Sequence, residues 1–242
     1  MRILNLGCGT KISNSKDIVN IDWSILLRIK KNFFLSKLLV LILNKERKKK
    51  LKNIPRNILV HNLKKGIPFK DNSIDAVYSS HVLEHIDRES APKFLNEILR
   101  VLKPNAINRI VVPDLYFLCS KYIENYKKCG NENQHSKNHE QFISSIIEQS
   151  VRKESNGTSK QKILIRKIEN LFLGDARKRG ETHQWMYDSV NLRQLLIEVG
   201  FKEVKVHSYI SSDIPEWDKY GLDKNELDQE YKPHSLYIES RK

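Results

Sequence analysis

The sequence predicts a doubly wound α/β fold built on a mostly parallel seven-stranded sheet. Short apolar runs alternate with amphipathic segments, which is typical of parallel strands joined by crossover helices. The first run ends in glycines, as buried strands do where such a sheet meets a ligand. The last run, 235–238, is reached without a crossover helix, so we expect an antiparallel last strand.

Five strands are expected in the first half of the chain, each an apolar run closed by turn residues. They span residues 2–6, 17–21, 57–60, 74–78 and 109–112. Apolar side chains at helical spacing predict a helix over 91–102, and the Lys-Pro-Asn sequence that follows is expected to end it in a turn.

The end of the chain repeats this alternation. Apolar residues on one face predict a helix over 190–199, and Gly200 is suited to end it. A strand resumes at 204–206, and with 235–238 it brings the count to seven. A chain of 242 residues can bury one sizeable core, so we expect a single domain over 1–242.

Two insertions interrupt the alternation. A basic, leucine-rich stretch at about 25–53 is expected to be a helical insertion. Between about 115 and 187 the pattern loosens, and polar loops flank helix candidates at 142–151 and 163–173. Because this second block follows the fifth strand, at the ligand end of the sheet, we expect a lid or substrate insertion.

The composition narrows the class of protein. Lys and Arg number 43 against 29 Asp and Glu, so the net charge of +14 favours an anionic partner or substrate. The three cysteines form no Cys-x-x-Cys pair, which excludes a thiolate zinc site and fits a reducing cytoplasm. We see no signal peptide, and the apolar block 32–43 is shorter than the about 20 residues of a spanning helix.

The basic stretch 28–52 has the makeup of an interfacial amphipathic segment, with apolar residues followed by a run of lysines. It could hold the protein at an anionic membrane surface. The alternative is a buried helix with a solvated charged tail, which is the commoner role of a charge run.

Glycines and an acid at the ends of the first two strands indicate a ligand. Gly7 and Gly9 let a ligand approach the backbone, although a plain glycine turn is the alternative. Ile12 stands where a dinucleotide fingerprint needs its third glycine, so NAD is disfavoured. Asp22 could accept both hydroxyls of a ribose, or it could cap the next helix. The pair predicts an adenosine-containing ligand that lacks a pyrophosphate.

Longer blocks resemble a known family. LNLGCGT, NID, IPFKDNSIDAVYSSHVLEHI and NEILRVLKPNAINRIVVPD are similar, in this order, to the motifs of class I S-adenosylmethionine-dependent methyltransferases, which have a Rossmann-like fold. GETHQWMYD and PHSLYIESRK are similar to a bacterial group of type 11-like methyltransferases associated with surface-polysaccharide genes.

The resemblance implies S-adenosyl-L-methionine as cofactor and assigns residues to it. The glycine loop would meet the methionine part through its amides, Asp22 would hold the ribose, and the residues after the third and fourth strands would meet the adenine and the transferring methyl. The implied cofactor-binding residues are Asn5, Gly7, Cys8, Gly9, Asp22, Asn62, Leu63, Ser80 and His81. Asn62 stands where an acid is often found.

His81, Glu84 and His85 also match His-x-x-Glu-His, a zinc-protease signature. On a helix the two histidines would share one face and could bind zinc. The motif, however, lies directly after a strand, and no further ligand is identifiable from the sequence. We therefore expect no metal, and we expect Glu84 and His85 to form hydrogen bonds within the fold.

Methyl transfer from a sulfonium is an in-line displacement, so positioning can supply most of the acceleration. A hydroxyl acceptor would in addition need a base as the new bond forms. The candidates are His81, Asp114 after the fifth strand, and His183 in the GETHQWMYD block. His183 could equally serve as a packing residue beside Trp185.

The expected reaction is O-methylation of a sugar or glycan intermediate, an acceptor that the resemblance alone implies. One alternative is an RNA methyltransferase, suggested by the charge, but the basic run lacks interleaved aromatic residues, so a nucleic-acid partner is disfavoured. Another is a noncatalytic membrane-associated adaptor that keeps the fold. The sequence leaves the oligomeric state open.

Overall fold

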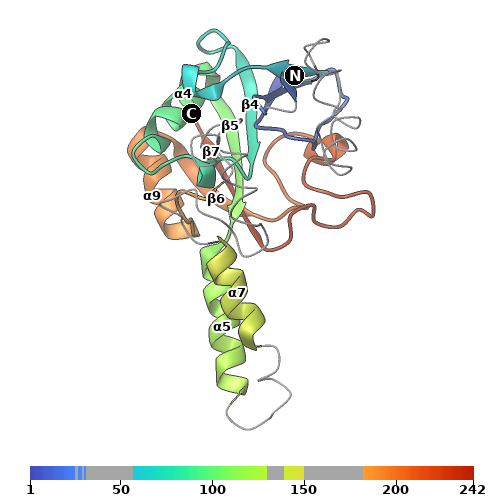
Figure 1. Cartoon of the computed structure of the whole chain (residues 1–242). Coiled ribbons are helices and arrows are strands. Elements are labelled where there is room, and N and C mark those ends of the chain that lie inside the picture. Colours follow the sequence, from blue (N-terminus) through green and yellow to red (C-terminus); the bar gives the residue numbers. More distant parts are fainter. Residues whose placement is uncertain (25–26, 29, 31–56, 130–138, 150–181) are drawn as a thin grey trace.

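The computed structural model describes residues 1–24, 27–28, 30, 57–129, 139–149 and 182–242. At its centre lies a seven-stranded sheet with the order β3-β2-β1-β4-β5-β7-β6 (Figure 1). The strands are β1 Ile3–Leu6, β2 Ile18–Asp22, β3 Ile58–Val60, β4 Ile74–Ser80, β5 Leu102–Pro113, β6 Lys202–His207 and β7 Ser235–Arg241. β1 to β5 are parallel, and β7 runs antiparallel to both β5 and β6. The predicted fold class and all seven strands are confirmed.

β5 is longer than predicted. It begins at Leu102 and includes the Lys-Pro-Asn sequence that was expected to form a turn. Within it Asn105 takes a positive φ of 63°, and the pairing with β4 shifts register between Ile74 and Ala76. Asparagine tolerates the left-handed region better than most residues, so the expected turn is reduced to one irregular position in a strand.

One face of the sheet is covered by two of the predicted helices, α4 Ala91–Val101 and α9 Ser189–Val199. Val77, Ile110 and Ile238, which lie on three neighbouring strands, pack with the buried side of both helices. Gly200 ends α9 in the left-handed conformation, with φ of 110°, as expected.

The opposite face is covered in another way. Tyr78, Val111 and Tyr237, one position along from the residues of the first face, pack against the connection between β6 and β7. This connection contributes Ile214, Trp217, Tyr220 and Leu222. In the described part of the chain, an irregular segment with one short 3₁₀ helix, η3 Trp217–Tyr220, thus stands where we expected helices.

A buried charge network joins this connection to the sheet. Arg109 on β5 is fully buried and pairs with Asp223 at 2.8 Å and with Glu239 at 2.6 Å. His207 and Asp213 lie beside Glu239. We call these five residues the Arg109 cluster.

Two helices leave the carboxyl end of β5 as an arm. α5 Leu115–Lys128 and α7 His139–Gln149 lie side by side and extend away from the sheet (Figure 1). α7 corresponds to the helix expected at 142–151. α5 was missed, because its apolar residues form no buried stripe: Tyr116 and Tyr126 are mostly exposed.

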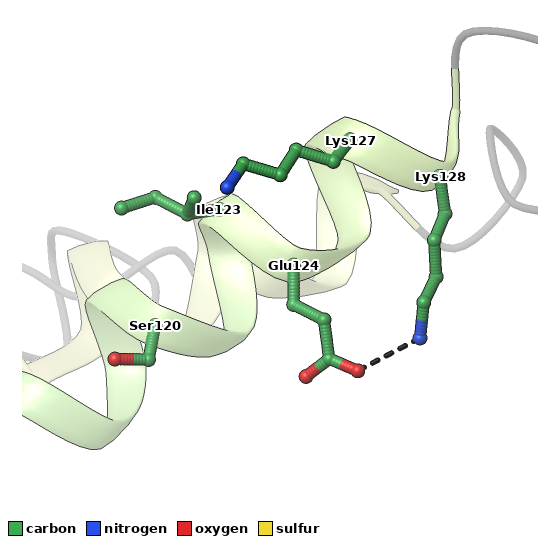
Figure 2. A pocket seen from close by; sticks show the side chains of 5 residues that line it. All are labelled: Ser120, Ile123, Glu124, Lys127 and Lys128. Atoms are coloured by element: carbon green, nitrogen blue, oxygen red, sulfur yellow. Dashed lines mark hydrogen bonds and ion pairs between the residues drawn. The ribbon is translucent and has the colours of Figure 1, made fainter.

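Figure 2 shows a shallow hollow on the outer surface of α5. Its described lining comes from this single helix, and Glu124 pairs with Lys128 across it at 2.7 Å. Among the described residues, no side chain from another element lines it, and we build no ligand site on it.

Several expectations fall outside the described residues. They are most of the basic insertion at 25–53 with its membrane segment 28–52, and the helix candidate at 163–173. The lid function of 115–187 also stays a prediction. Among the described helices, none is long and apolar enough to cross a membrane.

Candidate functional site

The carboxyl ends of the parallel strands bring the predicted cofactor residues to one edge of the sheet. Leu6 of β1 pairs with Ile21 of β2 and with Ser79 of β4, so the turns that follow these strands are neighbours. This edge, next to the switch in strand order at β1 and β4, is where open α/β sheets bind their ligands.

Asp22 turns toward the glycine loop. Its carboxylate is buried, Oδ2 accepts the amide of Gly9 at 2.8 Å, and Oδ1 accepts the amide of Ser24 at 2.6 Å. Asp22 therefore faces the loop and also caps the turn after β2, close to the capping role considered for it, while its contact with a ribose stays a prediction. Each oxygen keeps a second lone pair that could accept a hydroxyl.

Gly7 and Gly9 both adopt the left-handed backbone, with φ of 62° and 53°, but their surroundings differ. A Cβ on Gly7 would lie 2.5 Å from a methyl group of Val82. A Cβ on Gly9 would meet no atom of the described residues within 4 Å. Gly7 is thus required by packing, whereas the described residues leave space above Gly9 for a ligand.

Two amides of the glycine loop donate hydrogen bonds within the protein, whereas the resemblance implies that they face the cofactor. The amide of Cys8 donates to the carbonyl of Ile21 at 3.1 Å, and that of Gly9 donates to Asp22. A cofactor carboxylate would need other donors here. The Cys8 side chain is buried, and burial raises the pKa of its thiol.

Asn5 supports the loop from below. Its buried side-chain amide donates to the carbonyl of Lys11 and to Asn20, both at 3.0 Å. Asn5 therefore holds the turn in shape and does not project toward the open space above Gly9.

The residues assigned to the adenine lie beyond β3. Asn62 accepts the amide of Lys64 at 3.0 Å and so caps the 3₁₀ helix η1 Leu63–Lys65. The side chain of Leu63 packs against the core. Ser80 is half-buried at the end of β4. Their contact with a cofactor stays a prediction.

His81 follows β4 with a positive φ of 54°, and its amide donates to the carbonyl of Val111 at 2.9 Å. Its Nε2 lies 3.0 Å from the hydroxyl of Ser235, whose own proton goes to the carbonyl of Lys232. His81 therefore donates from Nε2, while its Nδ1 lies 3.1 Å from Oε1 of Glu84. With both nitrogens occupied, His81 is a poor candidate for the base.

Asp114 caps α5. One carboxylate oxygen accepts the amide of Tyr116 at 3.0 Å. Burial raises the pKa of Asp114, against the opposing effect of the Tyr116 and Phe117 amides, and the nearby Asp188 raises it further. A carboxylate with a raised pKa is better suited to accept a proton than an ordinary one.

His183 lies beside Glu84 and His85, which follow β4, although the two segments are far apart in the sequence. The next amide, of Gln184, donates to the carbonyl of Glu84 at 2.6 Å and holds the segment there. The His183 ring contacts the ring of His85 edge-on, with 4.8 Å between centroids. Its Nδ1 lies 3.0 Å from the carbonyl oxygen of Gln149 at the end of α7. We call Glu84, His85 and His183 the Glu84 cluster.

The His-x-x-Glu-His stretch differs from the helical arrangement that the zinc signature requires. Leu83–His85 is a 3₁₀ helix, η2, and His81 lies before it in the left-handed conformation. His81 and His85 therefore do not share a helix face. Glu84 and His85 do form hydrogen bonds within the fold, but through their backbone carbonyls, which accept from Gln184. Neither carboxylate oxygen of Glu84 accepts one from the described residues.

The sequence interpretation missed a contact between the glycine loop and the β6–β7 connection. The ammonium of Lys11 hydrogen-bonds to the carbonyl of Lys224 and lies 4.7 Å from the ring centroid of Tyr231. Burial lowers the pKa of Lys11. A lysine where relatives have further glycine was the only signal of this contact.

Comparison with known families gives one match. The family described as "Methyltransferase domain" matches residues 36–110. The chain is similar to methyltransferases. The matched segment includes β3, β4 and α4, but it is under a third of the chain and does not reach the glycine loop or Asp22. It supports a methyltransferase in general and leaves the acceptor open.

Solved structures of methyltransferases resemble this chain at low identity. An S-adenosylmethionine (SAM) dependent methyltransferase from Archaeoglobus fulgidus is 16% identical, with a TM-score of 0.42 and coverage of 100% of this chain and 86% of that chain. One from Mesorhizobium loti is 13% identical, with a TM-score of 0.43 and coverage of 100% and 90%. These likenesses are too distant to carry an argument about the reaction. No curated protein matches the chain.

Proposed function

We propose that the protein is an S-adenosylmethionine-dependent methyltransferase that methylates a hydroxyl of a sugar or glycan intermediate. The observation that carries the cofactor assignment is the pairing of Asp22 with the Gly9 turn beneath an open space at the carboxyl edge of the sheet. The glycan acceptor is supported only by the resemblance of GETHQWMYD and PHSLYIESRK to the polysaccharide-associated group.

The residues present fit the cofactor at its two ends. Asp22 has lone pairs for a ribose diol, and Gly9 leaves room that any side chain would reduce. When bound, S-adenosylmethionine supplies an electrophilic methyl group. The role of the chain is then to hold the acceptor oxygen in line with that methyl and to exclude water.

For the base we propose Asp114. It directly follows β5, and burial raises its pKa. Acceptance of the hydroxyl proton at its carboxylate would accompany formation of the new C–O bond. His81 and Glu84 would remain an orienting pair beside it.

Calorimetric titration with S-adenosylhomocysteine tests the cofactor assignment. We expect micromolar binding by the wild type and about 10- to 100-fold weaker binding by Asp22→Asn, the size of a lost hydrogen bond to a charged group. Asp17→Asn is the matched control, because Asp17 lies just before the other end of β2 and pairs with the terminal amine. Absence of binding by the folded wild type would refute the proposal and favour a noncatalytic adaptor.

The acceptor is tested separately, with methyl-labelled cofactor and fractionated cell extract. Label in glycan or in glycan precursors supports the proposal. Label confined to RNA would replace it with an RNA methyltransferase, and RNA binding should then fall steeply with salt. The peripheral membrane contact of 28–52 predicts that label also enters lipid-linked material when anionic vesicles are present.

A further inference from the structure

We propose that Glu84, His85 and His183 form a binding site for one divalent transition-metal ion of the zinc class. The inference does not depend on cofactor binding. It comes from a carboxylate and two imidazoles that separate parts of the chain bring together at the end of β4.

Glu84 is the central observation. Its side chain is only 2% exposed, and neither oxygen accepts a hydrogen bond. Among the described residues its ion-pair partners are His81, at 3.1 Å, and His85, at 3.9 Å. A buried carboxylate with so little compensation destabilises the folded protein by roughly several kcal/mol, because the charge has lost its hydration. A cation at this position would offset that cost.

The two histidines present ligand atoms to the same point. One ligand atom from each of the three side chains lies within 4.8 Å of the others. Ligands bound to zinc at about 2.0–2.1 Å in a tetrahedral site are roughly 3.4 Å apart. Side-chain rotations of about an ångström would therefore close the set, with no change in the backbone.

The environment of each ring suits a metal ligand. His183 places Nδ1 3.0 Å from the backbone carbonyl of Gln149, the outer-shell contact that orients a ligating histidine and leaves Nε2 for the ion. His85 has a buried Nδ1 without a hydrogen bond.

Space for a fourth ligand adjoins the cluster. Glu84 and His183 line a small cavity together with Tyr187, whose buried hydroxyl has no hydrogen bond. A set of two histidines and one glutamate leaves zinc an open coordination position, which a water or a substrate oxygen can take. The site would therefore be suited to bind an oxygen ligand at the base of the arm.

This proposal differs from the sequence expectation of no metal, which stays untested until zinc binding is measured. The motif contained two histidines but no third ligand, and the structure supplies His183 in place of His81. His81 instead lies in the second layer, with Nδ1 toward Glu84.

The test is zinc binding by the purified full chain after chelation. We expect one Zn²⁺ per chain, and a Co²⁺-substituted protein with the intense absorption of a tetrahedral site. Glu84→Gln and His183→Gln should each weaken Zn²⁺ binding by more than the roughly 10- to 100-fold that an outer-shell contact is worth. His207→Gln is the matched control, because His207 belongs to the other histidine–carboxylate group and should leave binding unchanged.

Three outcomes would overturn the proposal: no zinc retained by the wild type, zinc binding unchanged in both cluster variants, or zinc lost only in His207→Gln. Circular dichroism establishes that each variant is folded. The Co²⁺ spectrum of the wild type tests the site without any substitution, since an octahedral spectrum would also contradict it. S-adenosylhomocysteine titration of the same samples reports separately on the cofactor site.

Discussion

The Glu84 cluster and the Arg109 cluster each place a buried glutamate near histidine, but they satisfy its charge differently. Glu239 accepts Arg109 at 2.6 Å, the hydroxyl of Ser212 at 2.5 Å and the amide of Asp213 at 2.8 Å. The carboxylate oxygens of Glu84 accept no hydrogen bond from the described residues. The first carboxylate is neutralised within the protein, whereas the second has only imidazoles beside it.

This difference separates two uses of a buried charge. An internally paired charge fixes the packing of its neighbours, here the β6–β7 connection against the sheet, and the loss of one partner is costly. A buried charge left without donors destabilises the folded protein, and an external cation could offset that cost. Substitutions in the two clusters should therefore have opposite profiles of stability and metal binding.

The largest effect is expected for Arg109→Met. The substitution removes the guanidinium from Asp223 and Glu239 and leaves two buried carboxylates unpaired. We expect a loss of about 3–5 kcal/mol in the free energy of unfolding, measured by urea denaturation. The triple variant Arg109→Met, Asp223→Asn, Glu239→Gln should recover part of that loss. A single variant as stable as the wild type would show that the network is not structural.

A direct comparison of the two glutamates comes next. In the presence of a chelator, Glu239→Gln should lower the free energy of unfolding by about 1.5–3 kcal/mol, because hydrogen bonds to a charged acceptor are lost. Glu84→Gln should instead raise it, because the substitution removes a buried charge that the metal-free protein compensates poorly. Bound zinc should stabilise the wild type and Glu239→Gln. Glu84→Gln should lack this additional stabilisation, because it removes a zinc ligand. Equal losses in the chelated proteins would contradict the comparison.

The fold could be predicted from the sequence because strands and their helices carry strong periodic signals. β1 to β4, α4 and α9 all lie close to their predicted ranges, and the antiparallel β7 followed from the missing crossover helix. The covering of the second face could not be predicted in this way. Trp217, Tyr220 and Leu222 fill it from a segment with no helical or strand period, so their burial depends on tertiary contacts alone.

Contacts between residues that follow neighbouring parallel strands could be predicted from the sequence. Contacts between segments that only tertiary packing brings together could not. Asp22 and Gly9 meet because parallel strands align their carboxyl ends. The approach of His183 to Glu84 depends on how the segment before α9 packs, which no spacing in the sequence encodes. For the same reason the sequence could not reveal that Nε2 of His81 contacts the hydroxyl of Ser235.

A pH profile provides a smaller test of the Arg109 cluster. The hydrogen bond from Lys205 lowers the pKa of Asp213 in the folded protein, against the opposing effect of burial. Above the unfolded pKa, about 4, the ionised carboxylate contributes its full stabilisation. As the pH falls through that value toward the lower folded pKa, the unfolded state takes up more protons and this stabilisation is lost. Asp213→Asn should therefore flatten part of the decline in unfolding free energy below about pH 4, the unfolded pKa. An unchanged decline would show that Asp213 is not coupled to folding.

The smallest effect is expected at the exposed edge of the same cluster. Lys205 pairs with Asp213 at 3.0 Å, but its side chain is 54% exposed, so water and salt screen the pair. Lys205→Ala should lower the free energy of unfolding by less than about 1 kcal/mol, and the difference should shrink further in 1 M salt. Arg109→Met should keep most of its effect at the same salt concentration, because its partners are buried. If both losses fell together with salt, burial would not be what distinguishes the two pairs, and the contrast between compensated and uncompensated buried carboxylates would lose its basis.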